Sequence, residues 1–188
     1  RGLLGWQNSQ VHSHVPCKHA STSMLKFGES DRERVLTEVR HLGSNLQHAA
    51  EHYKNDHEIV LEAVRQYGRA FEFASDSCKS DRELVLAAVR LDEWAFQYAS
   101  QSCRNDREIV LTAVKKDGIC LRYAGEAYQA DREVVLEAVK RDGTALEYAS
   151  DGCRADHEVV LAAVTRSWRA LALAYEPCRS DLGLIQAA

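Results

Sequence analysis

The sequence predicts an all-α protein, a right-handed or superhelical α-solenoid of about six helical hairpin repeats. One motif recurs every 25 residues without insertion, each copy has a helical pattern, and no single copy could bury its own apolar face. The predicted solenoid covers residues 31–188 and follows an extended N-terminal arm, residues 1–30. An Asp opens each copy: Asp31, Asp56, Asp81, Asp106, Asp131 and Asp156, with a partial repeat from Asp181.

The first half of each copy, for example "DREVVLEAVKRDG", is predicted to be an α-helix. Asp131 suits the N-cap, because its carboxylate can accept hydrogen bonds from the free N–H groups of the first turn. Val135 and Val139 lie four residues apart and therefore share one face. Lys140 stands in the last turn, where the helix dipole favours a positive charge. Gly143 is expected to stop the helix in a left-handed conformation.

The second half of each copy is predicted to be a shorter helix. Gly152, and Pro177 one copy later, indicate a break or a tight turn near its end. Each copy is therefore expected to be a helical hairpin that is stable only when it is stacked between neighbours. The residues with the i, i+3, i+4, i+7 spacing of one helix face are Leu146, Ala149, Ser150 and Cys153.

The two ends of the array differ from its middle. The first copy has Arg34 and Glu38 where later copies have an aliphatic residue and Ala. This oppositely charged pair suits an exposed helix face and predicts a polar cap for the solenoid. At the other end Leu184 and Ile185 are still core-type residues, so we expect the natural chain to continue.

Four cysteines occupy one repeat position: Cys78, Cys103, Cys153 and Cys178. Tyr53 and Tyr128 fill the same position in the other two copies. A residue type that recurs with the period indicates packing, so these thiols are expected to be buried small hydrophobes. A ladder of disulfides is the alternative interpretation.

Composition narrows the classes of partner. The net charge of −4 argues against a bulk phosphate-binding surface. No apolar run approaches the roughly 18–20 residues that a membrane-spanning helix needs.

The string "DREVVLEAVKRDGTALEYAS" resembles a known helical repeat family, the one catalogued as domain of unknown function 4116. The resemblance covers about residues 31–188 and implies an array of helical hairpins. The family is common in algal and protist proteins and has no agreed activity, so it supplies no catalytic residue. The sequence departs from the family pattern at Glu93 and Trp168, where Gly is expected, and in the copy from Asp156 onward.

Residues that do not repeat are the candidates for function. Trp94 and Trp168 fall at the turn between the two helices of a copy, where Arg69 and Arg169 flank them. Because Trp is enriched at interface hot spots, we predict that these four residues and Trp6 bind a partner. The alternative is that each ring in the repeat fills a gap left by a missing Gly.

Metal-ligand residues occur in two places. His12, His14, Cys17 and His19 lie close together in the arm and are weak candidates for a zinc or copper site, although their spacing matches no standard finger. His48 and His52 are four apart, but His48 is interpreted as a packed side chain. The arm is poor in acidic residues, as organelle-targeting segments are, and we expect it to dock on the solenoid or on another subunit.

The sequence thus predicts a non-enzymatic scaffold, a peripheral subunit that binds other proteins and needs no cofactor. An algal or protist organellar membrane complex, photosynthetic or respiratory, is the favoured host, so plastid or mitochondrion is favoured over cytoplasm. The chain itself is expected to have no transmembrane segment and to bind no nucleic acid. One alternative is an RNA-binding helical-repeat protein, and another is a metal-binding regulator that uses the His/Cys arm.

Overall fold

The computed structural model describes residues 31–187, and this part of the chain is helical with no strand. Each copy contains three segments, a long α-helix, a six-residue 3-10 helix and a short final helix. The long α-helices are α1 (Arg32–His41), α3 (His57–Gln66), α5 (Arg82–Leu91), α7 (Arg107–Lys116), α9 (Arg132–Arg141) and α11 (His157–Val164), followed by α12 (Leu182–Ala187). The 3-10 helices are η2 (Gly43–His48), η3 (Gly68–Phe73), η4 (Glu93–Tyr98), η5 (Gly118–Tyr123), η6 (Gly143–Tyr148) and η7 (Trp168–Leu173). The short helices are α2 (Glu51–Lys54), α4 (Asp76–Ser80), α6 (Gln101–Arg104), α8 (Glu126–Gln129), α10 (Asp151–Arg154) and the 3-10 turn η8 (Cys178–Ser180).

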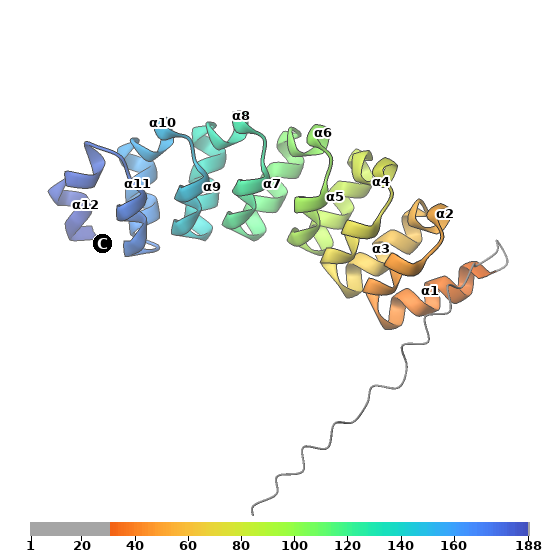
Figure 1. The fold of residues 1–188 in the computed structure, drawn as a ribbon. Helices are drawn as coiled ribbons and strands as arrows, with labels where there is room; N and C mark the ends of the chain where they lie inside the picture. Colours follow the sequence, from red (N-terminus) through yellow and green to blue (C-terminus); the bar gives the residue numbers. More distant parts are fainter. Residues whose placement is uncertain (1–30, 188) are drawn as a thin grey trace, which may run out of the picture.

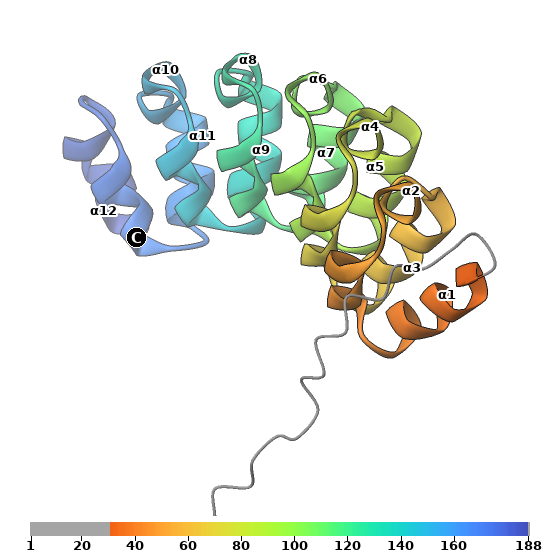
Figure 2. The ribbon, with the colours of Figure 1, turned by 45° about the vertical axis from the view of Figure 1, so that its right-hand side comes forward.

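These segments form a solenoid, as the sequence predicts. The long helices stand side by side along a curved row, and the short helices α4, α6, α8 and α10 line one edge of it (Figures 1 and 2). Each long helix packs against the long helix of the next copy and against the 3-10 helix of its own copy.

The predicted helix starts are confirmed. The Asp131 carboxylate accepts hydrogen bonds from the backbone N–H groups of Glu133 at 2.9 Å and Val134 at 3.3 Å. The residues that cap the first turn of a long helix in the same way are Asp56, Asp81, Asp106 and Asp156.

The prediction of a left-handed glycine at each helix end is wrong, because no described glycine has a positive φ. The long helix α9 ends instead at Asp142, whose backbone is extended and whose carboxylate accepts from the N–H of Thr144 at 2.8 Å. Gly143 is required for a different reason. A Cβ built on it would overlap the carbonyl oxygen of Ala163 in the next copy, so a side chain here would push two copies apart.

The second half of the copy is not one helix, and this prediction is also wrong. The 3-10 helix η6 ends at Tyr148, and both Ala149 and Ser150 are extended before α10 begins. The extended backbone turns the N–H of Ser150 toward the previous copy, where it donates to the carbonyl of Gln129 at 2.8 Å. Gly152 lies inside α10 and does not end it. The same hydrogen bond between copies is made by the backbone N–H of Ser75, Ser100, Gly125 and Tyr175.

One apolar core runs through the whole stack. The large side chains that are completely buried include Ile59, Phe71, Phe96, Ile109, Leu121 and Leu146. At the start of the array Arg34 and Glu38 are exposed, as a polar cap requires. At the other end Leu184 is buried as expected, whereas Ile185 is 47 % exposed, because no described residue covers it.

The recurrent cysteines are buried free thiols, as predicted. Their Sγ atoms also donate weak hydrogen bonds to the previous copy, for example from Cys153 to the carbonyl of Ala130 at 3.6 Å. Cys120, at a different repeat position, is buried too, and burial raises the pKa of its thiol to about 12.

Candidate functional site

The repeating charged residues hold neighbouring copies together. The Arg32 guanidinium, at the start of α1, donates to Asp56 at 2.8 Å and to Glu58 at 2.6 Å at the start of α3. Arg82 makes the same pair of contacts with Asp106 and Glu108 two copies further on. The hydrogen bond from Arg32 lowers the pKa of Asp56 below its ordinary value. The Asp and Glu at the start of a long helix, which look like a paired acid site in one copy, therefore cap that helix and pair with an arginine of the preceding copy. We call this series of contacts between copies the arginine ladder.

Trp94 is half-buried at the start of η4, and the Arg69 guanidinium of the preceding copy lies over its ring, 5.2 Å from the centroid. Glu93, at the Gly position, turns its carboxylate to Lys116 of the next copy at 3.3 Å. The Trp94 ring is therefore partly covered by the preceding copy.

Trp168 is different, because 65 % of it is exposed. The guanidinium of its neighbour Arg169 lies 5.5 Å from the centre of the indole ring. Trp168 lies three copies away from Trp94, so the two rings do not form one patch.

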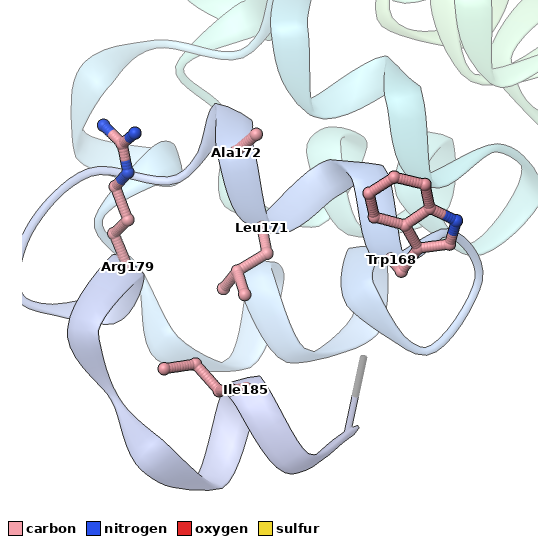
Figure 3. A pocket seen from close by; sticks show the side chains of 5 residues that line it. All are labelled: Trp168, Leu171, Ala172, Arg179 and Ile185. Carbon is pink, nitrogen blue, oxygen red and sulfur yellow. The ribbon is translucent and has the colours of Figure 1, made fainter.

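A hollow lies beside Trp168 at the C-terminal end of the described stack, between η7 and α12 (Figure 3). Leu171 and Ile185 line it, and both occupy repeat positions whose aliphatic or aromatic residues are completely buried in the inner copies. Ala172 and Arg179 complete the wall. The hollow has no carboxylate and no imidazole, so it offers an apolar contact surface.

The other candidates from the sequence are not brought together. Trp6 and the weak metal candidates His12, His14, Cys17 and His19 lie outside the described residues. His48 and His52 lie on η2 and α2 and are both exposed, so the interpretation of His48 as a packed side chain is wrong. Among residues 31–187 no three His, Cys, Asp or Glu side chains are grouped as a metal site would need.

Sequence reasoning missed a set of exposed apolar residues where the long helices end. Leu42 is 55 % exposed, Tyr67 44 % and Leu91 40 %. Leu42 and Tyr67 directly precede η2 and η3, at the repeat position where the third, fourth and fifth copies have a capping Asp. The same test that singled out Trp94, departure from the repeat, would have found them.

Comparison with known families gives a clear result. The family model described as Domain of unknown function (DUF4116) matches residues 31–79, 81–129 and 131–177 in tandem, which is more than half of the chain. The chain belongs to this family. Each DUF4116 match spans two of the 25-residue copies, so the family unit is a pair of stacked copies. No curated protein and no solved structure matches the chain.

Membership of DUF4116 accounts for the fold and leaves the activity open. The repeated residues of the family have structural roles in this chain. They are the capping Asp, the Gly at the start of the 3-10 helix and the apolar stripe. Trp168, Tyr67 and Leu42 replace a recurrent Gly or Asp and remain on the surface. These departures define the candidate binding residues.

Proposed function

We propose that this chain is a non-enzymatic scaffold, a helical repeat that binds another protein as a peripheral subunit of a larger assembly. The observation that carries the proposal is Trp168, a large ring that is 65 % exposed where most copies have Gly. Trp and Arg are enriched among the residues that dominate binding energy at interfaces, and Arg169 stands beside the ring. The core of the repeat does not need this side chain, so contact with a partner is the simplest use for it.

The state of the polar side chains supports binding rather than catalysis. An enzyme site requires an acid, base or nucleophile that is free to act on a substrate. Asp56, Asp106 and Asp156 are committed both as N-caps and as partners of an arginine. The recurrent thiols are buried; those of Cys103, Cys153 and Cys178 donate to backbone carbonyls, and that of Cys78 donates to the side-chain oxygen of Asn55.

The proposed host is an organellar membrane complex, photosynthetic or respiratory, of an alga or protist. Two observations support it: the acid-poor composition of residues 1–28 and the kinds of organism in which the resembling family is common. Within residues 31–187 no helix is long and apolar enough to span a bilayer. The proposal places the contact with such a complex on its protein subunits.

A native purification tests the scaffold proposal. The tagged chain, a Trp168→Gly variant and a Glu147→Ala control are purified gently from the source cells, and quantitative mass spectrometry identifies the proteins that co-migrate. Trp168→Gly installs the residue that the repeat prefers, and Glu147 is exposed on η6 in the preceding copy. We expect co-migrating proteins with the wild type and the control, and a loss of about tenfold or more with Trp168→Gly. A wild-type chain that runs alone as a monomer contradicts the proposal.

A further inference from the structure

The hollow at the C-terminal end of the described stack is apolar along its middle and basic at both ends. Trp168 stands at one end and Arg179 at the other, with Leu171 and Ile185 between them (Figure 3). The Arg169 guanidinium lies 5.5 Å from the centre of the Trp168 ring, so a positive charge accompanies each end. We call this surface the end hollow and define it as Trp168, Arg169, Leu171, Ala172, Arg179 and Ile185.

Both arginines of the end hollow lack an acidic partner. Arg169 and Arg179 are exposed, and neither side chain forms an ion pair or a hydrogen bond with any of residues 31–187. At the repeat position of Arg179 the earlier copies use the side chain for the fold, because those of Lys79, Arg104 and Gln129 donate to carbonyl oxygens of their own copies. Two positive charges therefore stand beside an apolar surface without neutralisation by the repeat.

The sixth copy also has fewer acidic side chains around this surface than the repeat allows. Ser167 replaces the Asp of the third, fourth and fifth copies, and Ala172 stands where the second and fifth copies have Glu. The carboxylates that follow in the chain are already bonded: Glu176 accepts from the hydroxyl of Ser180 at 2.6 Å, and Asp181 caps the first turn of α12. The end hollow is therefore complementary to an anionic partner, although the whole chain has a net charge of −4.

The apolar middle of the end hollow has the shape of a contact that the inner copies make with one another. At the repeat position of Leu171, Phe96 and Leu146 are completely buried, and so is Val160 at the position of Ile185. In the inner copies successive 3-10 helices pack against each other, as η5 and η6 do. Leu171 is only half-buried and Ile185 is 47 % exposed. A short helix laid on this surface would therefore repeat the packing of the inner copies.

We infer that the end hollow binds a short helical segment of a partner protein in which carboxylates flank an apolar centre. The apolar centre contacts Leu171, Ile185 and the Trp168 ring, and the carboxylates pair with Arg169 and Arg179. A guanidinium is suited to this role because its planar donors match a carboxylate. This inference rests on the scaffold function proposed above and specifies the chemistry of the partner at Trp168.

The charges of the end hollow argue against a second copy of the chain as the occupant. Two chains that met at their end hollows would bring Arg169 and Arg179 of one against the same arginines of the other, and like charges repel. The opposite end of the array presents Arg34 and Glu38, which offer no apolar contact. A nucleic acid also fits less well, because its phosphates follow one another closely along the strand, whereas apolar side chains separate the two guanidinium groups.

Peptide selection on the full-length chain tests the inference. The probe is a displayed library of random peptides of about three helical turns, and the enriched peptides are measured by fluorescence anisotropy. Arg179→Glu reverses one charge, Arg179→Lys keeps it, and Trp168→Gly removes the ring. Lys115→Glu is the control, because Lys115 is also exposed and without an ion pair among residues 31–187 but lies on α7, two copies away. Urea titrations check that each variant is folded.

The expected peptides have Asp or Glu on both sides of an apolar centre. Their Kd should rise about tenfold or more for Arg179→Glu and Trp168→Gly, and should stay near the wild-type value for Arg179→Lys and Lys115→Glu. Added salt should weaken their binding. A selection that enriches no acidic peptide, or peptides that bind all five proteins equally, would overturn the inference and leave the scaffold function standing on its co-migrating proteins.

Two further results would assign the end hollow to a different occupant and so overturn the inference. One is a wild-type dimer in analytical ultracentrifugation that Trp168→Gly makes monomeric, which would indicate a second copy of the chain. The other is binding of labelled oligouridylate by the wild type that Arg179→Glu abolishes, which would indicate a nucleic acid.

Discussion

The hydroxyl of Tyr128 donates a hydrogen bond to the backbone carbonyl of Asn105 in the preceding copy, at 3.1 Å. Cys153, at the same repeat position one copy later, sends its thiol to the equivalent carbonyl of Ala130. Tyr and Cys are very different in size, yet each places a weak donor at the end of the preceding short helix. In these two copies the position therefore holds a group that is half or fully buried and still donates one hydrogen bond.

Replacing Tyr128 by Phe isolates that hydrogen bond. Because the carbonyl of Asn105 loses its donor from the next copy, we expect Tyr128→Phe to lower the free energy of unfolding by about 0.5–1.5 kcal/mol in urea titrations. Tyr148→Phe is the control, since the residue is half-buried, its hydroxyl forms no hydrogen bond with residues 31–187, and its ring lies beside Arg122. Equal losses in the two variants would show that the bond to Asn105 adds nothing.

A pair of glycines tests the close approach of neighbouring copies. Gly143→Ala places a methyl group against the carbonyl oxygen of Ala163, so the copies must separate, and a loss of about 1–3 kcal/mol is expected. Gly152→Ala adds the same methyl group inside α10, where the nearest atom, Oγ of Ser150, is 4.0 Å away. That variant should be neutral or more stable by about 0.4–1 kcal/mol, because alanine restricts the unfolded chain. The melting temperatures of both variants are compared with that of the wild type. A lower melting temperature for Gly152→Ala would contradict the expected difference between the two glycines.

Buried thiols should be protected from modification. Burial raises the pKa of Cys120 to about 12, so almost no thiolate exists at neutral pH, and the thiolate is the reactive form. We expect a thiol reagent to label Cys120 and the recurrent cysteines slowly in the native protein and rapidly in denaturant, as followed by mass spectrometry. Rapid native labelling of Cys120 would contradict its burial. Protection that only a reductant removes would indicate disulfides instead.

The ladder between copies should make stability depend on pH on the acid side. The pKa of Asp56 is lowered in the folded chain by its hydrogen bond from Arg32, so its contribution is fully present above the unfolded value of about 4. That contribution is lost as the pH falls through the lower, folded pKa. Asp56→Asn keeps a good N-cap and removes the charge. Its free energy of unfolding should therefore fall less steeply than that of the wild type as the solution is acidified. Parallel pH profiles would show that the Arg32 contact has no energetic effect.

Local signals in the sequence predict the long helices and the register of the repeat. Asp131 caps its helix through its own neighbours in the chain, and Val135 and Val139 lie on the same face because of helical geometry alone. The break at Ser150 could not be predicted in this way, because it depends on a hydrogen bond to Gln129 in another copy. The role of Gly143 likewise depends on Ala163, twenty residues further along.

The candidate site residues also divide into those that the sequence pattern reveals and those that depend on how neighbouring copies stack. Subtracting the repeat directed attention to Trp168, which is 65 % exposed. It could not show that Trp94 is covered by Arg69, since that depends on how two copies stack. Tyr67 was visible as a departure from the repeat, but only the exposed ring and the missing cap show its significance.

The backbone hydrogen bond from Ser150 to Gln129, and its equivalents in the other copies, run along the length of the array. A force that pulls the two ends apart would therefore act in series on every junction between neighbouring copies. Within one junction the backbone hydrogen bond, the arginine ladder and the buried apolar surface would resist the force together. The weakest junction would open first and release one copy, about 25 residues, before the next yields. An assembly tethered by this protein would therefore have an elastic link that lengthens in steps of one copy.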